Sequence, residues 1–431
     1  MRRLILAAVL LWPAAAAAQQ QIPTDAWPTY NGDYTGRRCS TLTKINDGNV
    51  KHLSLAWSYR LSTPGAGPIK GTPLMVNGVV YLTAPDHVWA IDARTAREIW
   101  HWENKAVGGI QIGNRGVGIK GDYLYVETRD CNLVSLTIKD GKERWRKNLC
   151  NLDQFYYASV APIIIGNHVI CGVSGDDLDV PGYLESHNAE TGELEWRWYV
   201  VPQKADDPGI ESWPNLEMAK HGGGMTWQPV TYDPELNLLY VTTGNPQPVI
   251  AYVNRPGANL FTASIVALNP DDGKMKWYFQ SSPHDTHDWD ATQTAVVFDG
   301  EFEGQPRKMI AQASRNGKFF VLDRATRKAL VSSEYVKTNW TKGSDAKGQP
   351  IPAPLKDPQI AGSLVTPNQG GATNWPPPSF RPQTGLFYVS AAQAYSVWYI
   401  YDPGENPQGW GGTDRGGWQQ NMLQAIDYKT G

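Results

Sequence analysis

The sequence has little charge and no marked excess of either sign. Only 19% of its 431 residues are Asp, Glu, Lys or Arg, and the formal net charge is −3. Proteins that bind nucleic acids usually present a dense basic surface, so this composition argues against a nucleic-acid partner. The chain also lacks an apolar run of about 20 residues, the length that a membrane-spanning helix needs. We therefore expect a protein that neither binds nucleic acid nor spans a membrane.

Cysteine is scarce as well. The chain contains Cys39, Cys131, Cys150 and Cys171, whose spacing fits no zinc knuckle, and it has no CxxCH motif for covalent haem attachment. In an oxidising compartment a disulfide between Cys131 and Cys150 is one interpretation. Four buried thiols are the other.

The first 20 residues, MRRLILAAVLLWPAAAAAQQ, have the three parts of a secretory signal. Arg2 and Arg3 precede a short apolar run, and small residues follow at positions 16–18. The apolar run is too short to cross a bilayer. We therefore predict a signal peptide over residues 1–18 and a periplasmic location for the rest of the chain.

One motif recurs along the chain. Each copy begins with apolar residues, turns at a segment that holds Asp or Asn and usually Gly, and then continues as a second apolar segment, as a hairpin does. The four clearest copies end on Trp at intervals of about 40–50 residues or a multiple, a period typical of four-stranded propeller blades. These copies are AIDARTAREIW (90–100), SLTIKDGKERW (135–145), SHNAETGELEW (186–196) and ALNPDDGKMKW (267–277), and VLDRATRKAL (321–330) is a weaker one.

The repeat predicts an all-β fold in which residues 19–431 form one β-propeller domain. The 18 Trp of the chain then have a role, because a flat ring at a strand end can pack between neighbouring sheets. A sandwich of unrelated hairpins is the alternative. The last copy, AIDYKTG (425–431), stops before its final strand and Trp, so we expect the propeller to be incomplete at its C-terminal end. Two inserts rich in Pro and Gly, 202–227 and 343–362, interrupt the repeat, and long inserts often carry functional sites.

A local concentration of acid and imidazole groups occurs in SSPHDTHDWDATQ (281–293). One interpretation is a site for a hard cation built from carboxylates such as Asp288 and Asp290, which project to the same side if the segment is extended. A second uses His284 and His287 as ligands of a transition metal, which requires a helix that Pro283 disfavours. A third is a solvated turn. We expect His284 to be structural, with the neighbouring Asp285 as its hydrogen-bond partner.

Several further motifs give the chain a family resemblance over residues 26–431. With the repeat described above, the sequence resembles the quinoprotein alcohol dehydrogenases, which are eight-bladed propellers that use pyrroloquinoline quinone (PQQ) and a metal ion. The matching segments are IGNRGV (112–117), SVAPIII (159–165), GVSGDDLDVPGYL (172–184), HGGGMTWQPVTYDP (221–234), TTGNP (242–246), PHDTHDWDATQ (283–293), ASRNGKFFVLDR (313–324) and GGATNWPP (370–377).

The resemblance implies the residues of a metal site. Asp288 matches the catalytic base, and Asp290 lies where lanthanide-dependent members carry an additional carboxylate. The implied metal ligands are Asp177, Asn245, Asp288 and Asp290. All four offer hard oxygen donors, which suit Ca²⁺ or a lanthanide(III) ion better than zinc or copper.

The resemblance also implies a cofactor site. Trp227 matches the indole beneath the PQQ ring, and Arg115 and Arg315 match arginines that pair with its carboxylates and carbonyl oxygens. The remaining implied contacts are Ser159, Ser174, Gly175, Asp176, Asn374 and Trp375. Two positions depart from the family: Gly109 and Ile110 replace a pair of adjacent cysteines, and Lys70 replaces a glutamate of methanol-oxidising relatives.

The function implied is the periplasmic oxidation of a primary alcohol by hydride transfer to PQQ. Asp288 would act as general base and the ion as Lewis acid, and electrons would pass to a separate cytochrome c. A homodimer is compatible with this function. The alternative is a non-catalytic or degenerate β-propeller scaffold of the outer-membrane assembly type, for which a lipid-anchoring cysteine should follow the signal; the first cysteine is Cys39.

Overall fold

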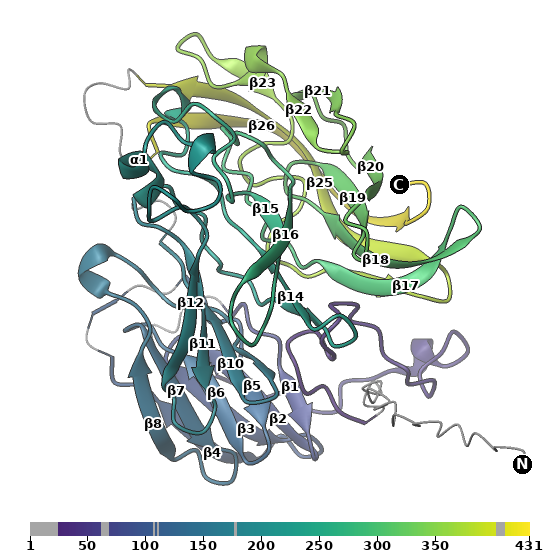
Figure 1. Ribbon diagram of the computed structural model, residues 1–431. Helices are drawn as coiled ribbons and strands as arrows, with labels where there is room; N and C mark the ends of the chain where they lie inside the picture. Colours follow the sequence, from purple (N-terminus) through teal and green to yellow (C-terminus); the bar gives the residue numbers. More distant parts are fainter. Residues whose placement is uncertain (1–24, 62–68, 107, 110–111, 176–178, 402–409) are drawn as a thin grey trace, which may run out of the picture.

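The fold is built almost entirely from antiparallel sheets (Figure 1). The computed structural model describes residues 25–61, 69–106, 108–109, 112–175, 179–401 and 410–431. Within these residues six four-stranded sheets follow one another along the chain, with one further two-stranded sheet. Helical structure in the same residues is limited to one α-helix and short 3-10 turns.

The first three sheets each consist of four consecutive strands. The first contains β1 (Leu74–Val76), β2 (Val79–Ala84), β3 (His87–Asp92) and β4 (Glu98–Glu103). The second contains β5 (Gly118–Lys120), β6 (Tyr123–Glu127), β7 (Asn132–Thr137) and β8 (Glu143–Asn148). The third contains β9 (Ile163–Ile165), β10 (His168–Gly172), β11 (Tyr183–Asn188) and β12 (Leu194–Tyr199).

The next two sheets repeat this order, and the sixth is arranged differently. The fourth contains β13 (Thr231–Asp233), β14 (Leu238–Thr242), β15 (Ser264–Leu268) and β16 (Met275–Gln280). The fifth contains β17 (Val296–Phe302), β18 (Gln305–Ala313), β19 (Lys318–Asp323) and β20 (Ala329–Glu334). In the sixth, β25 (Leu386–Ile400) pairs on one side with β23 (Ser363–Val365) and β24 (Ser379–Arg381) and on the other with β26 (Gly412–Asp427).

The two inserts form the remaining elements. The insert before β13 holds η3 (Ile210–Ser212) and α1 (Leu216–Lys220). The later insert contains the hairpin of β21 (Thr341–Ser344) and β22 (Pro350–Pro352), followed by η5 (Pro354–Lys356). Three further 3-10 turns are η1 (Val50–His52), η2 (Leu152–Gln154) and η4 (Tyr252–Asn254).

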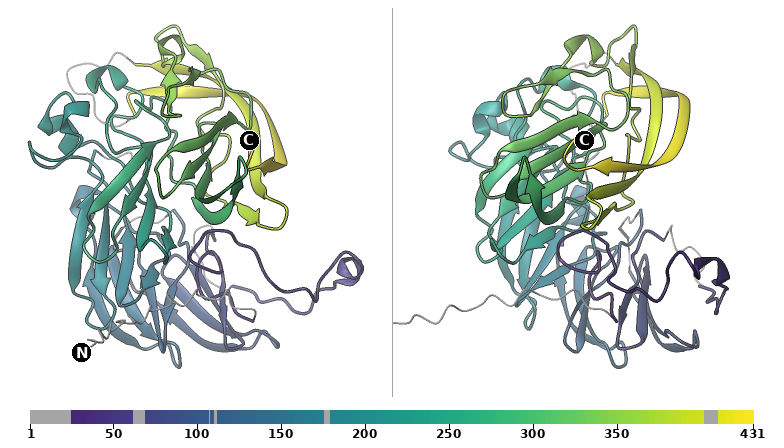
Figure 2. Two further views of the ribbon diagram at one scale, coloured as in Figure 1. Left: turned by 45° about the vertical axis from the view of Figure 1, so that its right-hand side comes forward. Right: turned by 90° about the vertical axis from the view of Figure 1, so that its right-hand side faces the viewer.

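The sheets are arranged as propeller blades. First strands of neighbouring sheets lie side by side, as β5 does with β9 and β13 with β17. The views in Figures 1 and 2 show the sheets following one another in sequence order from the blue to the yellow end. The all-β propeller is therefore confirmed, and the sandwich of unrelated hairpins is wrong. The total of eight blades stays a prediction, because the described residues form six sheets of this kind.

Two of the repeated Trp, Trp100 and Trp196, bond their own sheet to the next. The Trp100 Nε1 donates to the carbonyl oxygen of Ile138 at 2.9 Å, and its ring packs on Gly141 in the turn of the second sheet. The Trp196 Nε1 likewise donates to the carbonyl oxygen of Pro270 at 2.8 Å. The docking predicted from the repeat is therefore present, and it fixes the spacing between adjacent sheets.

The same turn explains the recurrent glycine. Gly141, Gly192 and Gly273 have φ of 68°, 73° and 66°, in the left-handed region that glycine adopts without steric cost. Ala96 and Arg327 occupy this position in the other copies and have φ of 60° and 68°. The turn geometry is therefore conserved within the chain even where the glycine is not.

An N-terminal strap, residues 27–38, crosses the ends of five sheets. Its backbone and Tyr34 bond to the first strands of the first, fourth and fifth sheets, to β9 of the third and to β24 of the sixth. The partners are Trp27 with Met75, Tyr34 with Ile164 and Tyr232, Thr35 with Val297, and Arg37 with Phe380. Gly36 permits this contact, because a Cβ there would lie 2.8 Å from the Ala295 carbonyl oxygen.

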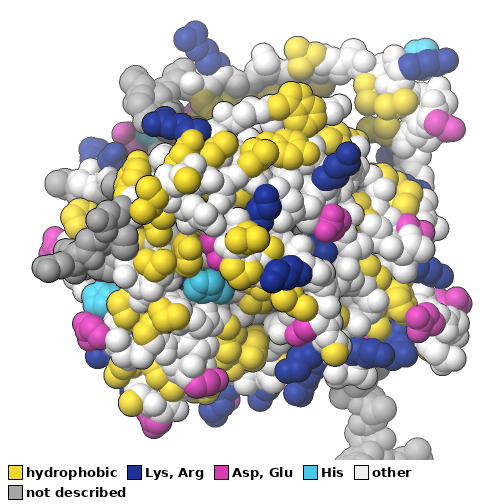
Figure 3. Space-filling view, turned by 90° about the horizontal axis from the view of Figure 1, so that it is seen from above, with side chains coloured by type: hydrophobic (Ala, Val, Ile, Leu, Met, Phe, Trp, Pro, Cys, Tyr) yellow, Lys and Arg dark blue, Asp and Glu magenta, His cyan; other side chains and the backbone are white. Residues whose placement is uncertain are grey.

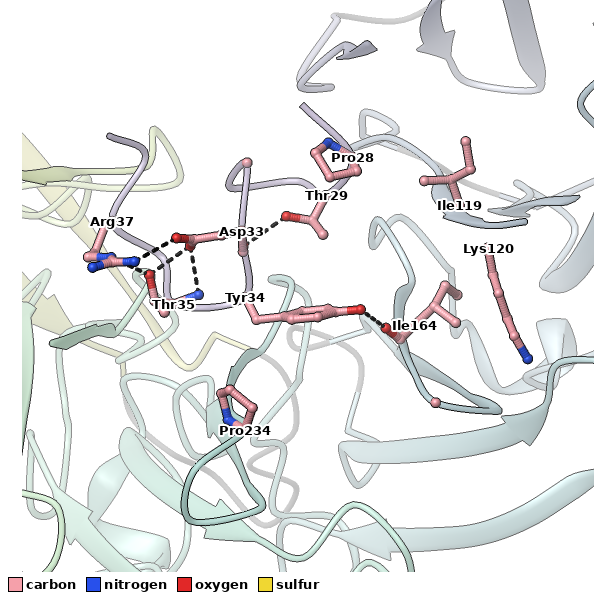
Figure 4. A pocket seen from close by; sticks show the side chains of 12 residues that line it. Pro28, Thr29, Asp33, Tyr34, Thr35, Arg37, Ile119, Lys120, Ile164 and Pro234 are labelled. Carbon is pink, nitrogen blue, oxygen red and sulfur yellow. Dashed lines mark hydrogen bonds and ion pairs between the residues drawn. The ribbon is translucent and has the colours of Figure 1, made fainter. Parts of the chain in front are cut away.

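A cavity of about 320 Å³ lies between the strap and the neighbouring blades (Figure 4). Its polar groups are already bonded to one another: Asp33 accepts from Arg37 at 2.9 Å, and Lys120 donates to Asn167 at 2.6 Å. The Tyr34 hydroxyl donates to the Ile164 carbonyl oxygen across the same space. Of these three bonds, the one from Tyr34 joins the strap to the third sheet.

Two cysteines form a disulfide, Cys131–Cys150, which joins the start of β7 to the segment after β8. Cys39 and Cys171 are free thiols. The disulfide interpretation is therefore confirmed, and the interpretation with four thiols is wrong.

Two other expectations concern the surface and the membrane. The predicted signal peptide, residues 1–18, lies outside the described residues. Among the helices of the described part, none has the length and apolar character needed to cross a membrane. On the face seen in Figure 3, charged side chains of both signs are scattered among hydrophobic ones.

The docking of Trp100 generates a stability prediction. This side chain is 9% exposed, whereas Trp418 on β26 is 56% exposed. We expect Trp100→Ala to lower the free energy of unfolding by about 3 kcal/mol, because it removes the contact between two sheets and leaves a cavity. Trp418→Ala should change it by less than about 1 kcal/mol. Urea unfolding followed by circular dichroism measures both, and equal effects would contradict the docking role.

Candidate active site

The candidate site is a cavity of about 180 Å³ where loops from several sheets meet. Arg115 precedes β5, Trp227 precedes β13 and Asp290 precedes β17, so the loops that enter the first strands contribute to its wall. Arg315 comes from the turn between β18 and β19. The fold therefore brings together residues as far apart in the sequence as Lys70 and Trp410.

A buried guanidinium bridges two carboxylates at the centre of this cavity. The Arg315 Nη1 lies 2.6 Å from the Asp290 Oδ2, and its Nη2 lies 2.9 Å from the Asp288 Oδ2. The three side chains are 6%, 2% and 7% exposed. Burial raises the pKa of Asp290, and the charge of Arg315 opposes that rise. Two carboxylates therefore share one guanidinium at this position.

The carboxylates converge for a different reason from the one expected. Asp288 has a φ of 60°, so the segment is not extended there. Trp289 is fixed instead: its backbone N–H donates to the Asp285 Oδ2 at 2.9 Å, and its Nε1 donates to the Asn368 carbonyl oxygen at 3.0 Å. This buried anchor sets the turn that directs Asp288 and Asp290 to the same arginine.

Asn245 completes one side of the acidic group. Its backbone N–H donates to the Asp290 Oδ1 at 2.8 Å. Its side-chain Oδ1 is buried and has no hydrogen-bond partner among the described residues, although buried polar atoms almost always have one. A buried amide oxygen beside a carboxylate is a donor that a hard cation could use. The described residues hold no cluster of three His, Cys, Asp or Glu side chains around one point, and Asp176 and Asp177 lie outside them.

Gln369 is a site residue that the sequence did not reveal. Its Nε2 donates to the Asp288 Oδ2 at 2.5 Å, and its backbone carbonyl oxygen accepts from the Arg315 Nη2 at 2.7 Å. Gln369 directly precedes the GGATNWPP motif (370–377). This position was the only feature of the sequence that could have indicated a role in the site. Gln369 and Arg315 together fix the Asp288 carboxylate.

The two histidines of the acidic stretch are structural. The His284 Nδ1 is 2.8 Å from the Gly257 carbonyl oxygen, and the His287 Nε2 is 3.0 Å from the Lys356 carbonyl oxygen. Burial lowers the pKa of His284 to about 4 and that of His287 to about 3, so both rings are neutral at pH 7. The structure gives no support to the transition-metal alternative. The expected pairing of His284 with Asp285 is wrong, because the Asp285 carboxylate accepts from the backbone of Trp289.

A second group of predicted residues meets at the wall of the same cavity. The Arg115 guanidinium lies over the Trp227 ring, 4.7 Å from its centroid. The Arg115 Nη1 donates to the Ser159 Oγ at 2.6 Å, and the Ser174 Oγ is 3.5 Å from that oxygen. A cation, an indole and two hydroxyls therefore lie together in this part of the site.

Of the remaining predicted cofactor residues, some line the cavity and others do not. Asn374 and Trp375 line the same cavity, where the Asn374 Oδ1 accepts from the Trp375 backbone at 2.8 Å. Gly175 has a φ of 138° and follows Ser174, but it does not line the cavity. Tyr157, Ile112 and Trp410 also line the cavity and were not anticipated.

Glu127 lies behind Arg115 and is completely buried. Burial raises the pKa of its carboxyl to about 8, despite hydrogen bonds from the backbone of Val160 at 2.6 Å and Gly172 at 3.4 Å. The charge of Arg115 also opposes the rise. Glu127 is therefore mainly protonated at neutral pH and does not cancel the arginine charge.

The sheet arrangement and this site define a propeller of the quinoprotein class. The family model described as "PQQ: Glucose/ethanol/alcohol dehydrogenase, beta-propeller domain" matches residues 27–360. The chain belongs to the PQQ-dependent alcohol dehydrogenase family.

Individual relatives agree with this assignment. The chain is 40% identical over 408 residues to the quinohemoprotein alcohol dehydrogenase of Comamonas testosteroni, covering 88% of this chain and 57% of that protein. It is 35% identical to the quinoprotein alcohol dehydrogenase PedH of Pseudomonas putida, covering 92% and 72%. The chain thus spans little more than half the length of the first relative.

Solved structures show the same fold. The crystal structure of the Comamonas testosteroni enzyme has a TM-score of 0.88 and 35% identity, covering 94% of this chain and 66% of that one. A europium-containing methanol dehydrogenase has a TM-score of 0.83 and 28% identity, covering 93% and 73%.

The burial of Glu127 generates a pH prediction. Its carboxyl binds a proton more tightly in the folded state, with a pKa of about 8, than at its ordinary value of 4.5. Its contribution to stability is therefore fully present below pH 4.5 and is lost as the pH rises through 8. We expect wild-type protein to lose about 1–4 kcal/mol more stability between pH 5 and 8 than Glu127→Gln.

Urea unfolding at pH 5, 6, 7 and 8 measures this difference. Taking the wild type relative to Glu127→Gln removes the contribution of the other titrating groups. Parallel curves for the two proteins would show that Glu127 does not titrate in this range.

Proposed function

We propose that this protein oxidises an alcohol in the periplasm with PQQ and a hard cation. The observation that carries the proposal is the buried arrangement of Arg315 between Asp288 and Asp290, next to the unpartnered Asn245 Oδ1. A cavity wall of tryptophans adjoins this group. A scaffold that only binds proteins would gain nothing from burying two carboxylates in this way, because such burial is costly without a compensating use.

The residues present fit a hard cation. Asp288, Asp290 and the Asn245 amide oxygen would hold it, together with Asp177 as the resemblance implies. Calcium and a lanthanide(III) ion are both compatible with oxygen donors. Asp290 adds a negative charge that suits the trivalent ion, and one structural relative is a europium-containing methanol dehydrogenase.

The rest of the cavity wall supports the binding of a flat, acidic quinone. Trp227 and Trp375 offer aromatic surface, and Arg115, Ser159 and Ser174 offer donors for carboxylate oxygens. The Arg115 guanidinium contacts one face of Trp227, so a quinone stacked on that face would require the guanidinium to move. Asn374 lies at the rim beside Trp375, and Gly175 and Asp176 are proposed cofactor contacts on the resemblance alone.

The reaction assigns distinct tasks to the residues of the chain. PQQ, when bound with the ion, supplies an electrophilic carbonyl group that accepts the hydride of the alcohol. The Asp288 carboxylate accepts the hydroxyl proton of the alcohol as general base. Arg315 and Gln369 orient that carboxylate through the Asp288 Oδ2, and the Arg315 charge stabilises negative charge as it develops nearby. Because the Asp288, Arg315 and Gln369 side chains pack together, little water reaches the Asp288 carboxylate that accepts the proton.

Electrons then leave for a separate cytochrome c, the acceptor that the family resemblance implies. The signal-like N-terminus supports a periplasmic location, where such an acceptor would be available.

The test is reconstitution of the purified protein with PQQ and either Ca²⁺ or La³⁺. We expect dye-linked oxidation of a primary alcohol, and we expect Asp288→Asn to lower kcat by about 100-fold or more while leaving KM within a few-fold. Asp299→Asn, an exposed carboxylate on β17, is the control and should retain activity.

Binding of PQQ without turnover under any of these conditions would contradict the dehydrogenase proposal. Absence of both binding and turnover would favour the non-catalytic scaffold.

A further inference from the structure

Two histidines meet on one face of the first sheet. The His87 Nδ1, at the start of β3, is 3.0 Å from the His101 Nε2 on β4. In the register of these strands His87 is opposite Glu103, and Trp89 is opposite His101. Because side chains alternate along a strand, all four project to the same side of the sheet. None of them lines the candidate active site, so the histidine pair needs an explanation of its own.

The His101 ring is held in position by a buried indole. It stacks on the ring of Trp89, with a centroid distance of 4.8 Å and an interplanar angle of 4°. Trp89 is buried, whereas His101 is exposed to solvent. A buried ring therefore orients an exposed imidazole, which reduces the conformational entropy that the imidazole loses when it binds a ligand.

The charges around the pair favour a cation. The pKa of His87 is lowered by burial and by the neighbouring His101. The Glu103 and Asp86 carboxylates act in the opposite direction. His87 is therefore neutral at pH 7, the form in which imidazole binds a metal ion. Asp86 is ion-paired with Arg129 at 3.0 Å, whereas Glu103 is exposed and directly opposite His87.

The distance between the two ring nitrogens matches that of a metal chelate. Two metal–nitrogen bonds of about 2.0–2.1 Å, at an angle of about 90–109°, place the nitrogens about 2.8–3.4 Å apart. A hydrogen bond between neutral imidazoles explains the same distance, with one nitrogen as donor and the other as acceptor. An ion needs a lone pair on both nitrogens, so the proton moves to the far nitrogen of the donor ring and the rings turn toward the ion. The exposure of His101 leaves room for this rotation.

We propose that His87 and His101 form a surface site for a divalent transition-metal ion, with Cu²⁺ bound more tightly than Zn²⁺. Imidazole nitrogen suits both ions, and the Irving–Williams order places Cu²⁺ above Zn²⁺. Water completes the coordination, because the described residues hold no third His, Cys, Asp or Glu side chain at this point. The site differs in chemistry from the oxygen donors around Asp288, and it does not depend on the proposed dehydrogenase function.

The test is a Cu²⁺ titration of the metal-free full chain, followed by electron paramagnetic resonance. Glycine is present as a competitor for weakly bound copper, and excess Ca²⁺ occupies sites made of oxygen donors. All proteins carry Cys39→Ser, which removes a partly exposed thiol that would react with Cu²⁺. We expect this parent protein to bind one Cu²⁺ with the nitrogen couplings of two imidazoles, and to melt at a higher temperature with the ion than without it.

Two substitutions and a matched control locate the ion. His87→Gln and His101→Gln should each weaken Cu²⁺ binding by about 100-fold, because each removes one of two imidazole ligands. His52→Gln, at an exposed histidine of η1, should bind as the parent protein does. Thermal melts without the ion establish that each variant is folded.

Three results would overturn the site. Equal Cu²⁺ affinity of the parent protein and both histidine variants places the ion elsewhere. Weakening by only one of the two substitutions, or the couplings of a single imidazole, shows that the pair is a hydrogen bond and not a chelate. Failure of the parent protein to retain Cu²⁺ against glycine leads to the same conclusion.

Discussion

The ion-paired group of Arg315, Asp288 and Asp290 is the constraint on which the site depends. Removing three charged groups from water is costly, and their attraction repays this only with close geometry and further hydrogen bonds. The structure supplies both: Gln369 donates to Asp288, and the Asn245 backbone donates to Asp290. The group also adjoins the Asn245 Oδ1, which has no hydrogen-bond partner among the described residues. The carboxylate and amide oxygens of this group are therefore suited to binding a hard cation.

The propeller provides the rigidity that such a group requires. Its members come from loops before β15 and β17, from the turn after β18 and from the segment before β24. These loops stay in register because Trp100 and Trp196 each bond one sheet to the next, and because the N-terminal strap bonds to five sheets. The Trp57 Nε1 makes the equivalent contact with the Ala93 carbonyl oxygen of the first sheet at 3.0 Å. The repeated motif thus determines the geometry of a site that lies outside the motif.

The sequence predicted the fold well because its signal is local and repeated. The turn with Asp or Asn and glycine fixes a hairpin, and the terminal Trp gives the period. The convergence of Asp288 and Asp290 was also predictable from their spacing, although the left-handed Asp288 shows that the supposed extended backbone was incorrect. The role of Gln369 could not be predicted, because it lies 81 positions from Asp288 in the sequence. Only the fold brings the two side chains into contact. The partner of His284 was missed for the same reason, because Gly257 is 27 positions away.

The most direct measurement of the central claim is a terbium(III) titration of the purified protein, with excitation of tryptophan and detection of terbium emission. If the carboxylate pair and Asn245 form a cation site, one ion should bind and be sensitised by the nearby indoles. Both Asp290→Asn and Asn245→Leu should then weaken that binding by about 10-fold or more, while the surface variant Asp299→Asn should not. Sensitised emission of equal strength in all four proteins would contradict the account, because the ion would then lie elsewhere.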